Sequence, residues 1–144
     1  MNRLLIATLA TVVPSCCQTY TFDPPGSTQT VAYGINTSGA TTGYYIDAAG
    51  VHGFVRDPSG SITSFDPSGS IETIPYSINT SGAITGYYFD ATGGHGFVRD
   101  PSGSITSFDP PGSTDTYAYS VNTSGAITGY YYVNTGGYHG FVRD

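Results

Sequence analysis

The chain has 144 residues, of which only 10% are charged, and it carries a formal net charge of −6 at pH 7. A negative, lysine-free surface repels phosphate groups, which argues against nucleic acid and anionic lipid headgroups as partners. With 13 Tyr, 7 Phe and 20 Gly, the composition favours β-strands broken by turns over helices or a disordered chain.

The first seventeen residues differ in composition from the rest of the chain. Arg3 precedes an apolar run over residues 4–13, and small residues follow it before Cys16. This pattern is typical of a secretory signal, and the run is shorter than the ~20 residues that span a bilayer. We predict a leader over residues 1–17 and an extracellular or cell-surface protein. In a lipoprotein alternative Cys16 is acylated, and a misassigned start codon or a β-strand also remains open for this run.

The remainder consists of three near-copies of one unit. The string HGFVRD begins at His52, His95 and His139, at spacings of 43 and then 44 residues. A period of this length built from short strands is typical of stacked β-sheet repeats. One unit has too little apolar surface to offset the entropy of ordering it, so each unit must pack against its copies. The predicted repeats are 18–57, 58–100 and 101–144.

The second unit shows the predicted order of strands and turns. A Pro-Ser-Gly turn leads to a strand over residues 61–65, and a second turn leads to a strand over residues 72–78. A polar tight turn at residues 79–82 joins that strand to one over residues 83–89, and residues 95–99 form the last strand. The sequence therefore predicts an all-β fold of tandem four-stranded antiparallel repeats, like the blades of a β-propeller.

Three repeats are fewer than a closed propeller uses, so we expect an open arc or a fragment of a larger propeller. Residues 19–24 repeat the sequence pattern of the strand at 61–65 and its Asp-Pro, so one first strand stands unpaired at the beginning of the chain. In a closed ring this strand would pair with the other end, and a dimer would have six blades. We favour a fragment, because exposed edge strands promote aggregation.

Three short motifs recur in every unit: Ile-Asn or Val-Asn before Ser-Gly, Thr-Gly-Tyr, and His-Gly-Phe. The pattern resembles the HAF-type repeats of extracellular bacterial proteins over about residues 19–144, with His-Gly-Phe where that family has His-Ala-Phe. The resemblance implies a secreted or surface β-repeat protein of propeller-like form, and it implies no catalytic residue. The first and third motifs lie at Ile35-Asn36, Ile78-Asn79 and Val121-Asn122, and at residues 52–54, 95–97 and 139–141.

We interpret the repeated histidines and Arg-Asp pairs as structural. A histidine in each copy more often bonds a turn or strand than binds zinc, and no carboxylate recurs at ligand spacing. The aspartate caps the Pro-Ser-Gly turn, and the arginine ties neighbouring units rather than binding a carboxylate or sugar. The adjacent Cys16 and Cys17 predict no disulfide. We therefore predict no catalytic, metal-binding or cofactor-binding residue. The repeat-defining residues are His52, Arg56, Asp57, His95, Arg99, Asp100, His139 and Arg143.

Paired tyrosines are the candidate ligand contacts. Their flat amphipathic rings suit stacking on sugars or anchoring a protein partner. A sheet covered on both faces would bury them instead, and that alternative stays open. The six residues are Tyr44, Tyr45, Tyr87, Tyr88, Tyr130 and Tyr131.

Near-identical units present the same groups three times, which suits multivalent contact better than catalysis at one asymmetric site. We predict a non-catalytic binding or structural module that contacts a polysaccharide or protein at the cell surface, or self-associates through open sheet edges. Two alternatives remain. The chain is a fragment of a propeller-type lyase or hydrolase whose active site lies in missing repeats, or it is a subunit of a self-assembling surface filament.

Overall fold

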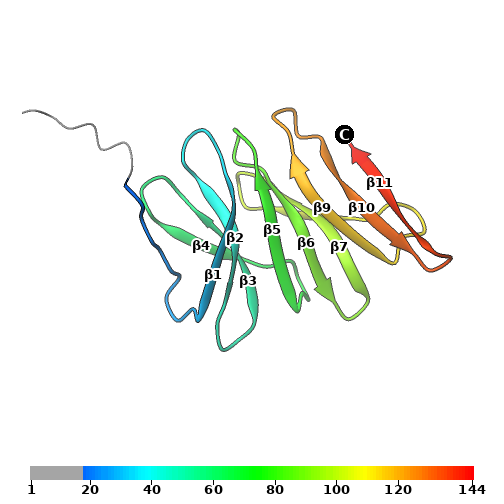
Figure 1. Cartoon of the computed structure of the whole chain (residues 1–144), viewed down its shortest axis with the longest axis horizontal. Helices are drawn as coiled ribbons and strands as arrows, with labels where there is room; N and C mark the ends of the chain where they lie inside the picture. Colours follow the sequence, from blue (N-terminus) through cyan, green and yellow to red (C-terminus); the bar gives the residue numbers. More distant parts are fainter. Residues whose placement is uncertain (1–17) are drawn as a thin grey trace, which may run out of the picture.

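A computed structural model describes residues 18–144, which form eleven β-strands (Figure 1). The all-β prediction is confirmed for this part of the chain. The predicted leader at 1–17, with its candidate acylation site Cys16, lies outside the described residues. Among residues 18–144 there is no helix of the length and hydropathy needed to cross a membrane.

The strands of the second unit agree with their prediction to within two residues at each end, because Pro-Gly and Asn-Thr-Ser-Gly turns mark where each one stops. The eleven strands are β1 (Gln29–Ile35), β2 (Thr41–Ile46), β3 (Val51–Arg56), β4 (Ile62–Phe65), β5 (Glu72–Ile78), β6 (Ile84–Asp90), β7 (Gly93–Arg99), β8 (Ile105–Phe108), β9 (Asp115–Val121), β10 (Ile127–Val133) and β11 (Gly137–Arg143).

All eleven strands belong to one open, mixed sheet. Its order is β1-β2-β3-β5-β6-β7-β9-β10-β11, with β4 paired to β3 and β8 paired to β7. Pairing is antiparallel within three structural units, β1–β4, β5–β8 and β9–β11, whereas β3 meets β5, and β7 meets β9, in parallel. These units, to which the word refers from here on, are offset from the predicted repeats, because β4 and β8 pair with the strand that precedes them in the chain. The expectation of purely antiparallel pairing is therefore corrected at these two links. The chain reverses once into β4 and again after it, so β5 runs in the same direction as β3.

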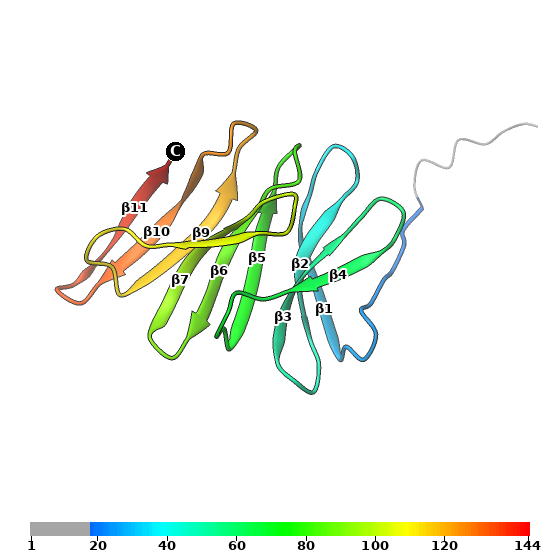
Figure 2. The same cartoon turned by 180° about the vertical axis from the view of Figure 1, so that it is seen from behind.

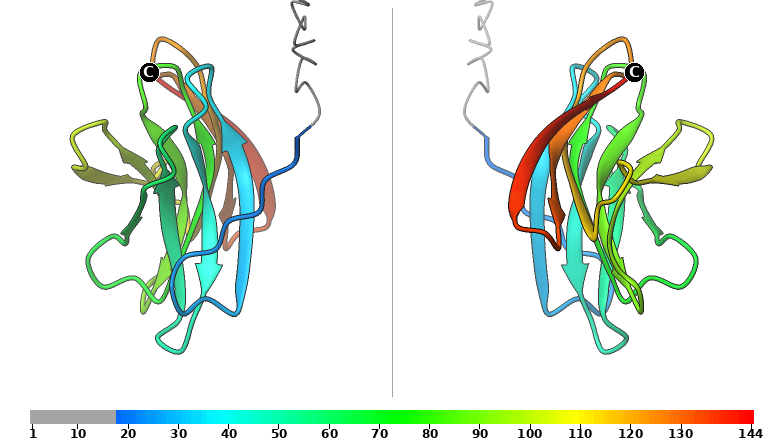
Figure 3. Two further views of the ribbon diagram at one scale, coloured as in Figure 1. Left: turned by 90° about the vertical axis from the view of Figure 1, so that its left-hand side faces the viewer. Right: turned by 90° about the vertical axis from the view of Figure 1, so that its right-hand side faces the viewer.

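Strands β4 and β8 leave the main layer and lie across one side of it (Figures 2 and 3). β4 pairs only with β3, where Gly53 opposes Phe65 and Arg56 opposes Ile62. β8 repeats this pairing with β7, in the same register. Each of these short strands thereby extends one unit and reaches toward the unit that follows.

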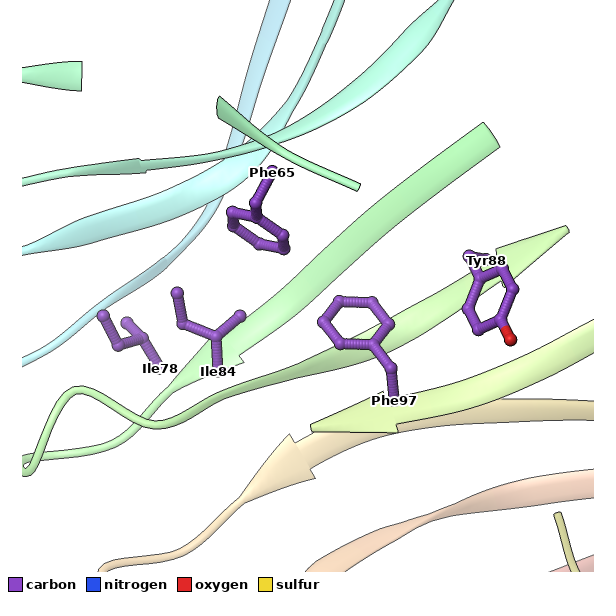
Figure 4. Close-up of a cluster of buried hydrophobic side chains, with 5 residues drawn as sticks. All are labelled: Phe65, Ile78, Ile84, Tyr88 and Phe97. Carbon is purple, nitrogen blue, oxygen red and sulfur yellow. The ribbon is translucent and has the colours of Figure 1, made fainter. Parts of the chain in front are cut away.

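Each core cluster consists mainly of residues of one unit and is completed by a phenylalanine from the unit before it. Phe65 of β4 points toward Ile78, Ile84 and Phe97 of the following unit (Figure 4). Phe65 and Phe97 meet edge to face with their ring centroids 6.0 Å apart, and Phe97 is fully buried. Burial of such a side chain contributes about 2–3 kcal/mol. This shared core supports the prediction that each unit must pack against its copies.

Middle strands approach their neighbours closely at a glycine in each unit. Gly86 of β6 lies opposite Pro75, next to a bulge in β5 between Pro75 and Ser77. A Cβ atom at Gly86 would collide with the carbonyl oxygen and carbonyl carbon of Ile74, which are backbone atoms and cannot move aside. The bulge therefore depends on glycine at this position.

We predict that Gly86→Ala lowers the free energy of unfolding by about 3 kcal/mol, because overpacking against backbone forces the strand pair apart. Gly140→Ala is the matched control, since its Cβ would meet nothing nearer than 3.9 Å, and it should stay within about 0.5 kcal/mol of wild type. Urea unfolding followed by far-UV circular dichroism measures both. Equal stability of the two variants would contradict the close approach.

Candidate functional site

The two tyrosines of each pair lie on opposite sides of their unit, because successive strand residues alternate. Tyr88 packs with Phe65 and Phe97 in the core cluster, and its hydroxyl lies 2.9 Å from the Ser107 hydroxyl. Tyr87 faces the following unit, where its ring centroid is 4.9 Å from that of Tyr117 on β9. Alternation thus assigns one tyrosine of each pair to the core side and one to the junction with the next unit.

The prediction that Tyr45 and Tyr88 contact a ligand is corrected. Their side chains are 8% and 6% exposed, and the Tyr45 hydroxyl lies 3.0 Å from the Ser64 hydroxyl. A surface ligand cannot stack on these rings. Tyr131, the equivalent residue of the third unit, lies on the same side and is partly buried beside His139.

The other tyrosine of each pair belongs to a continuous aromatic array that runs from β1 to β11. The Tyr33 and Tyr76 rings stack 4.5 Å apart, and Tyr76 meets Tyr119 edge to face at 4.6 Å. Further ring contacts of 4.9–5.9 Å complete the array. We call it the tyrosine band, and its members are Tyr33, Tyr44, Tyr76, Tyr87, Tyr117, Tyr119, Tyr130 and Tyr138.

The band is closed in the middle and open at both ends. Tyr33 is 47% exposed at one end and Tyr138 is 72% exposed at the other, whereas the central rings are half-buried. Tyr130, Tyr138, His139 and Gly140 line a shallow hollow of about 400 Å³ at the β11 end. The hollow is of the size and lining that suit a small part of a ligand.

Burial sets the electrostatics of the band. Desolvation, reinforced by the neighbouring Tyr76 hydroxyl, raises the pKa of Tyr87 well above its ordinary value. Desolvation and the Tyr130 hydroxyl raise the pKa of Tyr119 in the same way. The hydroxyls therefore stay neutral throughout the physiological range, and the band offers aromatic faces and neutral hydrogen-bonding groups.

The sequence predicted only Tyr44, Tyr87 and Tyr130 among the eight tyrosines of the band. Tyr33, Tyr76 and Tyr119 were not among the candidate contacts, although they recur every 43 residues. Each precedes by three positions the asparagine of an Asn-Thr-Ser turn. Their period was the available signal, but single tyrosines between other residues did not stand out as the Tyr-Tyr pairs did.

Each of the first two histidines lies between two carboxylates. His52 Nδ1 is 2.7 Å from Asp66 Oδ2, and its Nε2 is 3.4 Å from Asp47 Oδ1. His95 repeats the arrangement with Asp109 at 2.7 Å and Asp90 at 3.2 Å. The sequence predicted that each histidine ties a turn or strand to neighbouring backbone, and the structure corrects this, because the partners are aspartate side chains. In each cluster one aspartate follows β4 or β8, which we call the crossover strands. The other aspartate lies at the start of the β2–β3 or β6–β7 hairpin turn.

The carboxylates favour the charged form of these histidines. The hydrogen bond that His52 donates to Asp66 raises the pKa of His52, and partial burial opposes it only in part. Burial lowers the pKa of His95, but the hydrogen bond and charge of Asp109 outweigh it and the net shift is upward. Hydrogen bonds from Thr92, aided by the charge of His95, lower the pKa of Asp90 to about 2.

Thr92 joins this second cluster, with its hydroxyl 2.9 Å from His95 Nε2. A hydroxyl, an imidazole and the Asp109 carboxylate in this order resemble the relay of a nucleophilic enzyme. A general base at His95 would need a free lone pair on Nε2. That atom instead faces the Asp90 carboxylate at 3.2 Å, which favours a proton on it. The cluster therefore acts as an ion pair that ties a hairpin to the crossover strand.

The arginines lie flat on phenylalanines. The guanidinium carbons of Arg56, Arg99 and Arg143 are 5.1, 5.0 and 4.8 Å from the ring centroids of Phe22, Phe65 and Phe108. Such contacts contribute about 0.5–2 kcal/mol, more as water is excluded. The three side chains are thus engaged inside the molecule.

Aspartates and asparagines hold the turns. The Asp57 carboxylate accepts hydrogen bonds from the Ser59 hydroxyl and the Ser61 amide, and Asp100 repeats this at its own turn. Across the units, the Asn36 side-chain amide donates to the Asn79 carbonyl at 3.0 Å. Asn79 donates in the same way to the Asn122 carbonyl at 3.0 Å, and we call these two bonds the asparagine ladder. Within residues 18–144, no three His, Cys, Asp or Glu side chains group as metal ligands.

Comparisons with known proteins assign no family to the chain. No family model and no curated protein matches the sequence. Among solved structures, a streptogramin B lyase structure aligns with a TM-score of 0.45 and 16% sequence identity. The alignment covers 85% of this chain and 43% of that one, so this chain spans less than half of that protein's length.

We predict that stability falls as pH rises from about 6 to 9. His52 and His95 have raised pKa values when folded, so their contribution is complete below the unfolded value near 6.5. It is lost as pH passes through the folded values, because a neutral Nε2 leaves a lone pair facing a carboxylate. Urea unfolding at several pH values measures it.

The double variant His52→Gln and His95→Gln should flatten this dependence, whereas His139→Gln should retain it, because no carboxylate contact to His139 occurs among residues 18–144. A wild-type protein equally stable at pH 6 and pH 9 would contradict the prediction.

Proposed function

We propose that the protein is a non-catalytic binding module of the cell surface that contacts a neutral polysaccharide through the open β11 end of the tyrosine band. The observation that carries the proposal is the hollow beside Tyr130 and Tyr138, where an exposed aromatic ring adjoins a concave surface. Sugars stack their apolar C–H faces on aromatic rings, and their hydroxyls bond neutral groups at the rim.

Charge supports a neutral ligand. The chain has a net charge of −6, and three of its four arginines lie against phenylalanines, so few cations remain to attract an acidic polymer. The hydroxyls of Tyr87 and Tyr119 in the band stay neutral, as their raised pKa values require. A neutral polysaccharide is the partner that this surface repels least.

We further propose that the three units are consecutive blades of a propeller-like array, in line with the HAF-type resemblance. The support lies in the first strand of each unit, since β1, β5 and β9 come together through the stacked tyrosines and the asparagine ladder. Contacts that repeat every 43 residues are those expected of blades around one axis.

We predict that Tyr138→Ala weakens polysaccharide binding at least about fivefold, since an aromatic contact contributes about 1 kcal/mol. Tyr20→Ala is the matched control, because Tyr20 and Tyr138 are both 72% exposed but Tyr20 lies outside the band. Binding to a panel of neutral and acidic polysaccharides is measured by isothermal titration calorimetry at low protein concentration. Binding to acidic members alone, or equal loss in both variants, would overturn the proposal.

A further inference from the structure

The first and second units, and the second and third units, are joined in the same way. β4 pairs with the outer edge of β3, and its Phe65 packs on Phe97 and Arg99 of the next unit. The same arrangement recurs one unit later, where β8 pairs with β7 and places Phe108 on Phe141 and Arg143. Each crossover strand thus pairs with the sheet of its own unit and contributes a phenylalanine to the core of the next unit.

The outer edge of β11 carries no such strand among residues 18–144. Gly140–Arg143 repeat the sequence of Gly53–Arg56, which is the stretch of β3 that receives β4. Val142 on this edge is 73% exposed, and a hollow of about 350 Å³ lies against Phe141, Val142 and Arg143. An edge of this kind is a ready template for another strand.

Residues 19–23 have the sequence of a crossover strand without its partner. They read Thr-Tyr-Thr-Phe-Asp, against Ile-Thr-Ser-Phe-Asp at residues 62–66. Phe22 packs on the first unit as Phe65 packs on the second. Its ring centroid is 5.7 Å from that of Phe54 and 5.1 Å from the guanidinium carbon of Arg56. The backbone of residues 19–23 pairs with no strand within the described chain.

Residues 19–23 and the free edge of β11 lie at opposite ends of the array, so they do not meet within residues 18–144 of one molecule (Figure 1). We propose that residues 19–23 of one copy add as a strand to the β11 edge of a second copy, head to tail. The partner is therefore another molecule of this protein, recruited by strand addition. Such a heterologous contact builds a ring or a filament.

The internal junctions specify the register and the contacts. Gly140 opposes Phe22 and Arg143 opposes Thr19, as Gly53 opposes Phe65 and Arg56 opposes Ile62. The partner's Asp23 then reaches His139, as Asp66 reaches His52.

Two further contacts between the copies follow from the same register. The Thr21 hydroxyl meets that of Tyr131, as Ser64 meets Tyr45. The Asn122 amide donates to the Asn36 carbonyl of the next copy, which extends the asparagine ladder.

This arrangement shares a surface with the proposed ligand site. β9 lies over Tyr87 through Tyr117 and Tyr119, and β1 of the next copy would lie over Tyr130 in the same manner. Strand addition and polysaccharide binding therefore exclude each other. The inference does not rest on the polysaccharide, since association is measured without it.

The test is sedimentation velocity on the full chain between about 1 µM and 1 mM, the range in which a modest interface associates. Wild type should show concentration-dependent association. Thr21→Pro removes a strand donor and should weaken association at least tenfold. Ala48→Pro is the control, because Ala48 lies in the β2–β3 turn outside the junction, and it should associate as wild type does.

A charge exchange tests the register. His139→Asp places two carboxylates opposite each other and should weaken association at least tenfold. The double variant Asp23→His with His139→Asp should restore it. Unfolding curves for each variant confirm that the monomer is folded. A monomer at every concentration, or association that Thr21→Pro leaves unchanged, would overturn the proposal; loss of polysaccharide binding alone would not.

Discussion

The packing of a phenylalanine from one unit into the core of the next is the contact on which the rest of this structure depends. Phe65 leaves its own unit on a four-residue strand and fills the core of the next one beside Phe97, under the guanidinium of Arg99. Because a phenylalanine of one unit completes the apolar core of the next, each unit depends on its neighbour for packing, as in other repeat proteins. The same dependence underlies our proposal that residues 19–23 of one copy pair with β11 of another.

Strand alternation lets the same short strands serve packing and recognition. In β6, Tyr88 faces the core with its hydroxyl against Ser107, and Tyr87 faces the band. Charge is separated likewise, since the histidines lie between carboxylates at the hairpins and crossover strands, while the band is neutral. The open end of the band and the open edge of β11 adjoin at His139, so the proposed ligand binding and the proposed assembly would use the same place.

Much of the secondary structure was predictable, because turns with a positive-φ glycine or a proline mark the strand ends. Strand β5 was predicted at its exact bounds, and the alternative that a covered sheet buries the tyrosines holds for Tyr45 and Tyr88. The parallel links between units were not predictable, since they depend on how β4 folds back. Nor was the Asp47–His52–Asp66 cluster, whose members are joined across a hairpin and a crossover strand.

The sequence by itself determined an all-β chain of three units, the positions of its turns and the residues that recur, because these follow from local propensity and period. Only the tertiary structure decided which tyrosine of each pair is buried and which belongs to the band. Alternation places the two on opposite sides, but the crossover strand covers one side and the next unit covers the other. That choice is made by packing between units, which no local pattern of residues records.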